Sequence, residues 1–277
     1  MTRSDLSLPV AARPSRVSRR ALTVIRDRLS ARDWAVLQTI ADHRFVTTAQ
    51  LQAFHFTDHT TDDSAARVCR RVLARLRRDR LIAGLARRVG GIRAGSASRV
   101  WYLDCAGDRL LRTPSTPRRR AYEPSLYFLQ HTLAVVDTHL RLVALAQRGR
   151  LTLVQVQTEP QCHRHYRGLS GAGLVLKPDL FVVTASATYE DRWFIEVDQG
   201  TESRRRLLAK CQEYEAYRRS GIEQGRHQVF PLVIWLIADG SRRDALRDAI
   251  ARDPQLRADL FRLVTPAAIS QLVTAGA

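Results

Sequence analysis

The chain has 277 residues, 45% of which are hydrophobic, and it carries a formal net charge of +18. It is long enough for two domains and apolar enough to bury a core, but it has no run of about 20 apolar residues that could cross a bilayer. So large a positive charge without a membrane span or a secretion signal predicts a nucleic-acid partner, DNA or RNA, and we expect a cytoplasmic protein.

The N-terminal part of the chain changes character near residue 29. Residues 1–28 are rich in serine, arginine and proline, so we expect a flexible basic arm. Residues 29–111 have the pattern of a compact unit. Ser30 is an N-cap signal for an amphipathic helix, a threonine at 47 or 48 begins a second helix, and a longer third helix is predicted over residues 62–79.

Two predicted strands follow the third helix, at residues 81–84 and 99–103. The loop that joins them, residues 87–98, contains glycine and arginine. Three helices followed by a two-stranded hairpin are typical of the winged helix-turn-helix, which inserts its third helix into the major groove of DNA. In this interpretation the loop is the wing.

The third helix and the segment after it are rich in arginine. Between Ala65 and Arg120 the chain has sixteen arginines and three acidic residues. A charged helix face can simply be solvated, but such a one-sided charge beside a wing-like hairpin favours a surface that contacts double-stranded DNA. The arginines expected to contact DNA are Arg67, Arg70, Arg71, Arg75, Arg78, Arg87, Arg88 and Arg93.

Residues 112–123 are a basic, proline-rich linker, and residues 124–277 are expected to form the second unit. Its predicted elements are a helix over 124–148, strands over 151–158, 179–184 and 192–198, a helix over 202–219, a strand over 229–237, a helix from Ser241 to 252, a strand over 261–264 and a closing helix. This order indicates a mixed sheet flanked by helices, so the fold class expected for the whole chain is α+β.

Three carboxylates of the second unit stand at strand ends. Asp179 opens one predicted strand, and Glu196 and Asp198 close the next. Residues i and i+2 of a strand share a face, and hairpin pairing would bring Asp179 beside the other two. Carboxylates that converge at a sheet end suit Mg²⁺, an ion that assists phosphodiester cleavage. The two lysines of the chain, Lys177 and Lys210, flank this cluster.

This arrangement resembles the PD-(D/E)xK, or restriction-endonuclease-like, nuclease fold. Pro178-Asp179 matches its Pro-Asp element and Glu196 matches the acidic residue of its second motif, but Asp198 stands where that family usually has lysine. The resemblance implies that Asp179 and Glu196 bind Mg²⁺ and that Asp198 is a further acid of the catalytic site. It also implies that Lys210, on the following helix, supplies the missing positive charge.

The whole chain is also similar to the replication-relaxation family of bacterial plasmid and mobile-element proteins. The similarity rests on the run from Phe194 to Glu202 and on Lys177-Pro178-Asp179, and it extends over residues 30–270. It implies an N-terminal winged helix joined to a nuclease-like domain. The function it implies is relaxation, replication or mobilisation of plasmid DNA.

Two hypotheses from different classes follow. In the first, the winged helix selects a DNA site and the second domain nicks or clamps DNA there. In the second, the second domain is a degenerate nuclease fold that serves dimerisation or the docking of a relaxase or replication protein. The chain would then be a non-catalytic regulator or a relaxosome accessory protein. The aspartate at position 198 motivates the second hypothesis.

Other polar residues suggest alternatives that we favour less. The cysteine and histidines of segment 162–166 lack the partner pair of a zinc site, and the segment is expected to be a loop. His131 is interpreted as a core or interface histidine, Glu159 as a loop residue, and Glu202 as an acid that complements a helix dipole. The four cysteines form no CxxC pair and are expected to be reduced thiols.

Overall fold

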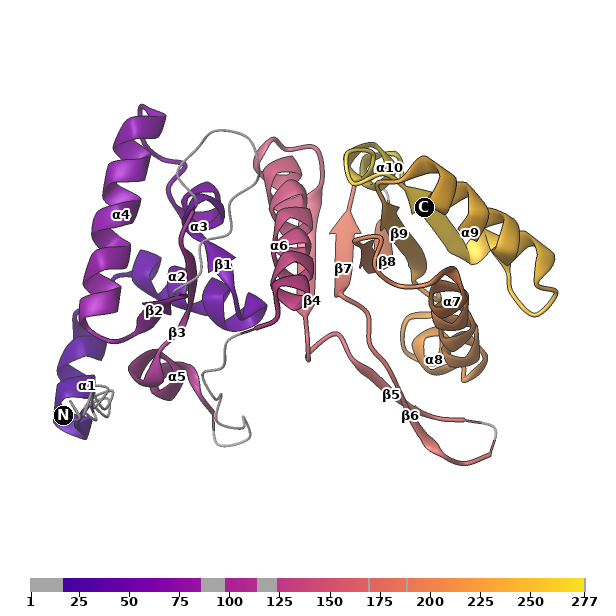
Figure 1. Cartoon of the computed structure of the whole chain (residues 1–277), viewed down its shortest axis with the longest axis horizontal. Helices are drawn as coiled ribbons and strands as arrows, with labels where there is room; N and C mark the ends of the chain where they lie inside the picture. The colour runs from indigo at the N-terminus through magenta and orange to yellow at the C-terminus, as the bar shows by residue number, and fades with distance from the viewer. Residues whose placement is uncertain (1–16, 86–97, 114–123, 169, 188, 277) are drawn as a thin grey trace, which may run out of the picture.

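The computed structural model describes residues 17–85, 98–113 and 124–276, except 169 and 188. Within these residues the strands form a three-stranded, a five-stranded and a two-stranded sheet; helices pack around the first two, and the two-stranded sheet projects from the body (Figure 1). The expected α+β class is confirmed. None of the described helices combines the length and the apolar composition that are needed to cross a membrane.

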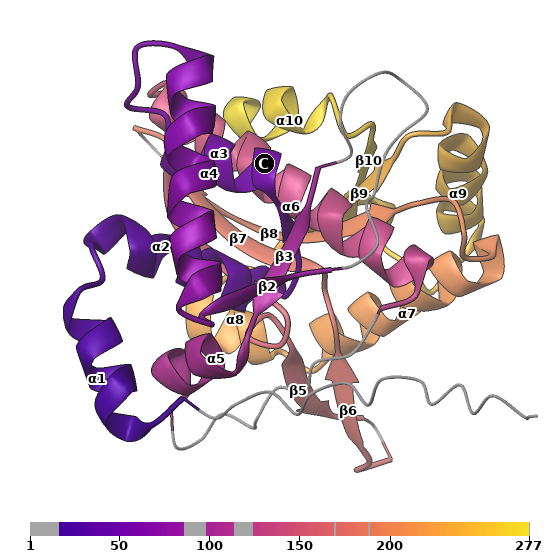
Figure 2. The same cartoon turned by 60° about the vertical axis from the view of Figure 1, so that its left-hand side comes forward.

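The N-terminal part contains five helices and three short strands among its described residues. They are α1 (Arg19–Asp27), α2 (Ala31–His43), β1 (Val46–Thr47), α3 (Thr48–His55), α4 (Asp62–Arg78), β2 (Ile82–Gly84), β3 (Val100–Leu103) and α5 (Cys105–Leu111). The predicted antiparallel pair is present as β2 and β3, and β1 adds a third strand in the order β1-β3-β2. α4 lies on the side of this part farthest from the five-stranded sheet (Figures 1 and 2).

Side-chain caps explain where these helices begin. Ser30 accepts a hydrogen bond from the backbone N–H of Asp33, and the Asp33 side chain accepts one from Ser30 in return. Thr47, one of the two threonines expected to begin the second helix, forms the same reciprocal pair with Gln50. Such capping boxes satisfy N–H groups that the first turn of a helix leaves unpaired.

Two N-terminal elements correct the sequence-based prediction. Residues 19–27, expected in a flexible arm, form α1, because Ser18 caps the helix and Ile25 is buried in the core it shares with α2 and α4. α5 was not predicted. Asp104 caps it, and its Ala106 is fully buried.

The C-terminal part is larger. Its elements are α6 (Leu126–Gln147), β4 (Thr152–Thr158), β5 (Arg164–Arg167), β6 (Gly173–Leu176), β7 (Leu180–Ala185), β8 (Glu190–Asp198), α7 (Arg204–Arg219), α8 (Ile222–His227), β9 (Leu232–Ile237), α9 (Gly240–Arg252), a 3₁₀ turn (Ala258–Leu260), β10 (Phe261–Val264) and α10 (Ile269–Ala275). The five-stranded sheet has the order β10-β9-β8-β7-β4. β4, β7 and β8 are antiparallel and β8, β9 and β10 are parallel, so the expected mixed sheet is confirmed.

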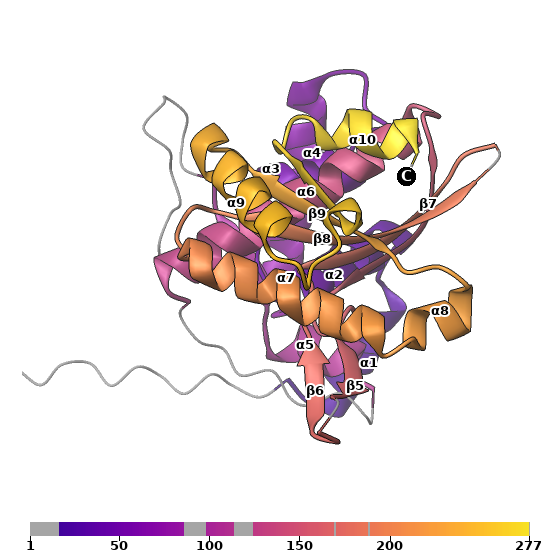
Figure 3. The same ribbon diagram turned by 90° about the vertical axis from the view of Figure 1, so that its right-hand side faces the viewer.

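The two faces of this sheet are covered by different helices (Figure 3). Trp193 and Ile195 share a core with residues of α6 and α10, whereas Phe181 and Phe194 share one with residues of α7 and α9. Side chains alternate between the faces along a strand. Glu196 and Asp198 therefore point, like Phe194, toward the α7 face.

α6 lies between the N-terminal helices and the five-stranded sheet (Figure 1). Its Val136 is buried in the N-terminal core, and its Leu142 in the core of the sheet. Gln50 of α3 donates hydrogen bonds to the carbonyl of Leu133 (3.0 Å) and to the carboxylate of Asp137 (2.7 Å). The helix is thus shared by both parts. The predicted linker falls largely in residues 114–123, which lie outside the described residues.

Three details of the C-terminal prediction were wrong. Arg164–Arg167 is not a loop but strand β5, which pairs with β6 in a projecting hairpin. α7 begins at Arg204 after the cap Ser203, so Glu202 precedes the helix. Asp239, and not Ser241, caps α9.

Candidate active site

The register of one hairpin brings two of the predicted acids together. Leu180 of β7 pairs with Ile195 of β8, so Asp179 and Glu196 are the next residues of the two paired segments. Asp179 Oδ2 accepts a hydrogen bond of 2.7 Å from the backbone N–H of Val197. This bond fixes the Asp179 carboxylate against the end of β8.

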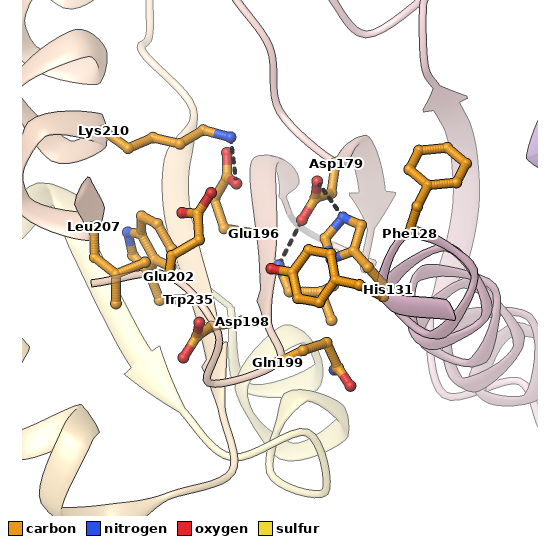
Figure 4. Close-up of a pocket in the computed structure, with 12 residues that line it drawn as sticks. Phe128, His131, Asp179, Glu196, Asp198, Gln199, Glu202, Leu207, Lys210 and Trp235 are labelled. Atoms are coloured by element: carbon orange, nitrogen blue, oxygen red, sulfur yellow. Dashed lines mark hydrogen bonds and ion pairs between the residues drawn. The ribbon is translucent and has the colours of Figure 1, made fainter. Parts of the chain in front are cut away.

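A cavity of about 160 Å³ opens at this end of the sheet (Figure 4). The four residues proposed from the sequence all line it, so the structure brings them together. The lining residues are Tyr127, Phe128, His131, Asp179, Glu196, Val197, Asp198, Gln199, Glu202, Leu207, Lys210 and Trp235. They come from α6, from the ends of β7 and β8, and from β9, α7 and the segment before α7.

Glu196 and Lys210 form a buried contact in this cavity, which is an ion pair when Glu196 is deprotonated. Glu196 is 3% exposed, and its Oε2 lies 2.8 Å from Lys210 Nζ. Tyr214, one turn further along α7, donates a short hydrogen bond to Glu196 Oε1. Lys210 Nζ also donates to the carbonyl of Lys177, at 2.9 Å. The strand end and the helix are therefore joined through the site.

Burial dominates the protonation of Glu196. It raises the pKa of this carboxyl to about 8, because the opposing effects of Lys210 and Tyr214 are smaller than the loss of solvation. Burial alone would lower the pKa of Lys210, but the charges of Glu196 and Asp179 outweigh it and raise that pKa. Lys210 is therefore charged at neutral pH.

His131 pairs with Asp179, which corrects our interpretation of this histidine as a core or interface residue. Its Nε2 lies 3.1 Å from Asp179 Oδ1, and its ring lines the cavity (Figure 4). Burial would raise the pKa of Asp179, but the hydrogen bond and charge of His131, the charge of Lys210 and the N–H of Val197 together outweigh burial and lower it. The same pairing raises the pKa of His131, against the effect of its own burial.

Asp198 lines the cavity but is held by an arginine that the sequence did not reveal. Arg242 Nε lies 2.5 Å from Asp198 Oδ2, and its Nη2 lies 2.9 Å from Oδ1. Arg242 also donates to the carbonyl of Glu202, at 2.6 Å. The guanidinium therefore neutralises the third acid and fixes the segment between β8 and α7.

Asp179 and Glu196 are the residues of this cavity that fit a divalent cation. Among the described residues no group of three His, Cys, Asp or Glu side chains is arranged to hold a metal. Mg²⁺ at phosphate sites, however, is usually bound through one or two carboxylates together with substrate phosphates and water. Each carboxylate oxygen of the pair has two lone pairs, so its present hydrogen bond leaves a further acceptor direction.

Cys162 supports the Pro-Asp segment, a role that no sequence signal indicated. Its buried thiol donates a hydrogen bond of 3.0 Å to the carbonyl of Pro178. Burial raises the pKa of this thiol to about 12, so it remains protonated. His163 pairs with Glu159 at 3.2 Å outside the cavity. All four cysteines are free thiols.

The arginines of α4 divide into two groups. Arg67, Arg70, Arg71 and Arg78 are exposed. Arg75 instead forms an ion pair of 2.6 Å with Asp33, which is 1% exposed. The predicted contacts Arg87, Arg88 and Arg93 lie outside the described residues.

Residues 37–233 match the model of the family described as Replication-relaxation. The match covers well over half of the chain. It begins within α2, ends within β9, and includes α4 and every residue that lines the cavity except Trp235. No curated protein and no solved structure matches the chain.

Proposed function

The chain belongs to the replication-relaxation family, and on this premise we propose that it binds double-stranded DNA through its N-terminal part and nicks DNA at the Asp179–Glu196 cavity with the help of Mg²⁺. Membership of the family supports a role in plasmid or mobile-element replication or relaxation. DNA binding and nicking are the mechanistic steps that we add.

One observation carries the nicking proposal. Two carboxylates and one ammonium group, from three different elements, face the same solvent-accessible cavity. Asp179 directly precedes β7, Glu196 lies near the end of β8 and Lys210 lies on α7. This set resembles that of the PD-(D/E)xK nucleases, with the lysine supplied by the helix.

Each residue of the cavity would have a different role in cleavage. Bound Mg²⁺ would polarise the scissile phosphate and lower the pKa of a water molecule. Asp179 is anionic and oriented by His131 and Val197, and Glu196 becomes a metal ligand when it is deprotonated. The Lys210 ammonium would stabilise the negative charge that develops on the phosphate in the transition state.

Support for DNA binding comes from α4 and the strands after it. We propose that α2, α3, α4 and the β2–β3 pair form a winged helix whose α4 enters the major groove. The exposed Arg67, Arg70, Arg71 and Arg78 would then meet phosphates or base edges.

A supercoiled-plasmid assay with Mg²⁺ or Mn²⁺ tests the proposal. The wild-type protein should convert supercoiled plasmid to open circles, and Asp179→Asn, Glu196→Gln and Lys210→Ala should each slow this by about 100-fold or more, because each removes a group that acts on the reacting phosphate. Glu190→Gln is the matched control, since Glu190 lies on β8 but outside the cavity and pairs with Arg192. Nicking that persists in Asp179→Asn and Glu196→Gln would refute the proposed site.

A second candidate function has its own supporting observation. Both oxygens of Asp179, Glu196 and Asp198 already accept from protein donors, and Arg242 neutralises Asp198. Such a site could be a structural remnant in a regulator or relaxosome accessory protein that docks a relaxase, a replication protein or a second copy of itself. In that case purified protein would bind DNA, leave the plasmid intact with every metal, and keep its DNA affinity in Asp179→Asn.

A further inference from the structure

The turn after α2 has an unusual backbone. Arg44 has φ 68° and ψ −47°, and the N–H of Phe45 donates a hydrogen bond of 2.8 Å to the carbonyl of His43. This is a γ-turn with positive φ at its central residue, a rare and strained conformation. Glycine adopts positive φ without penalty, whereas a residue with a Cβ atom does not.

Contacts on both sides hold this turn in place. His43 Nε2 lies 2.9 Å from His139 Nδ1 on α6. The hydroxyl of Thr158, at the end of β4, donates a hydrogen bond of 2.9 Å to the carbonyl of Asp42. Phe45 is 4% exposed in a core that includes residues of α6. Strained residues persist only where their surroundings over-determine them, and they cluster at functional sites.

Arg44 lies beside the candidate active site. It lines a small cavity of about 40 Å³ together with His131 and Asp179, and both of these also line the larger cavity. The small cavity therefore adjoins the carboxylate pair. Arg44 is the cationic side chain of the N-terminal part that lines the small cavity.

The acids that line this small cavity with Arg44 have other partners, and Asp179 pairs with His131. Asp42 accepts a hydrogen bond of 2.7 Å from Gln38, and Glu159 pairs with His163. Within the part of the chain that the structure describes, the guanidinium of Arg44 forms no ion pair within 4.0 Å. A partly buried arginine in a strained turn thus has its donors available for a ligand.

We propose that Arg44 is a phosphate-binding residue that the N-terminal part contributes to the active site, where it holds a DNA phosphate next to the one that reaches Asp179 and Glu196. The inference rests on the proposed function. A phosphate that approaches two carboxylates needs compensating cations, and a guanidinium binds phosphate oxygens in a bidentate manner. The strain would keep this group directed at the substrate before DNA binds.

Binding of a labelled DNA duplex in EDTA, over a series of salt concentrations, tests this inference without requiring cleavage. Arg44→Ala should weaken binding by about tenfold near 0.1 M salt and lower the slope of log K against log salt by about 0.9, the value for one phosphate contact. Arg44→Lys keeps the charge and should retain most of the slope. Arg247→Ala is the matched control, because Arg247 is an exposed arginine of α9 that pairs with Asp244.

Arg44→Gly separates a functional from a structural role. Glycine relieves the positive-φ strain and removes the guanidinium, so this variant should melt no lower than the wild type and yet bind DNA as weakly as Arg44→Ala. Wild-type affinity and slope in both variants would overturn the inference while leaving the proposed function intact. A wild-type protein that binds no DNA would instead refute the proposed function itself.

Discussion

Asp179 and Glu196 share one cavity, but their pKa values shift in opposite directions. Burial acts to raise both pKa values, but at Asp179 His131, Lys210 and the N–H of Val197 together outweigh it and lower the pKa, whereas at Glu196 burial prevails and raises the pKa to about 8. Neighbouring acids with divergent pKa values can take different roles. Asp179 is therefore anionic at neutral pH, and Glu196 becomes anionic only as the pH approaches about 8 or a cation binds.

The raised pKa of Glu196 predicts a pH-dependent stability. A carboxyl whose folded pKa exceeds its unfolded value stabilises the fold at low pH, and this stability is lost as the pH rises from 4.5 to about 8. The unfolding free energy of the wild type should therefore fall relative to that of Glu196→Gln across this window, by more than about 1 kcal/mol.

Urea unfolding of both proteins without metal measures this difference. Glu190→Gln serves as the control, because Glu190 is a glutamate of β8 that lies outside the cavity. A Glu196→Gln protein that becomes less stable than the wild type toward pH 8 would show that the ion pair with Lys210, and not burial, governs this carboxyl.

At the residue scale the sequence predicted the site side chains that lie on two neighbouring strands and on the helix that follows them. Asp179 and Glu196 meet because the β7–β8 hairpin joins them. Lys210 lies on α7, the next element along the chain, which packs on the face of the sheet to which Glu196 points. His131 and Arg242 were missed as site residues, since they come from α6 and α9 and only the tertiary fold brings them to the cavity.

At the element scale α4 was predicted closely, and the structure assigns different roles to its arginines. Arg71 is exposed, and we propose that it contacts DNA, whereas Arg75 neutralises the buried Asp33. Arg71→Ala should leave stability within about 0.5 kcal/mol and weaken DNA binding about tenfold near 0.1 M salt. Arg75→Ala should cost about 1–3 kcal/mol of stability, because it leaves a buried carboxylate without its cation.

Thermal unfolding and DNA titration of these two variants check the assignment. Both variants lose one positive charge from the same helix, so each is the charge-matched control for the other. If both variants lost the same DNA affinity and had the same stability, the assignment of a DNA-contact role to Arg71 and a structural role to Arg75 would be wrong. Unchanged DNA affinity in both variants would exclude α4 from the DNA interface.

The elements that the sequence missed have identifiable physical causes. β5 and β6 form an isolated hairpin with several exposed residues, so no alternation of buried and exposed side chains marks them strongly. α1 buries a single residue, Ile25, and its arginine-rich composition is typical of a disordered arm. The central strands β7, β8 and β9 were predicted from the sequence because their apolar runs are buried on both faces.

At the scale of the whole molecule α6 connects the proposed DNA-reading part to the cavity. It buries Val136 in the N-terminal core, accepts hydrogen bonds from Gln50 and carries His131 into the cavity (Figures 1 and 4). A connection through a packed helix transmits a fixed geometry, unlike a flexible linker.

This connection predicts that nicks fall at a constant distance from the protected DNA site. Footprinting of the bound protein and primer-extension mapping of the nicks on the same plasmid provide the comparison. Nicks scattered evenly around the plasmid, with no relation to the footprint, would mean that the two parts act independently.

The position of a bound divalent ion tests the central claim most directly. In crystals grown with Mn²⁺ and a short DNA duplex, an anomalous difference map should show a peak about 2.1 Å from a carboxylate oxygen of Asp179 and of Glu196, with a phosphate oxygen completing its ligands. An ordered duplex with no peak at these two residues, or with Mn²⁺ bound only elsewhere, would contradict the account.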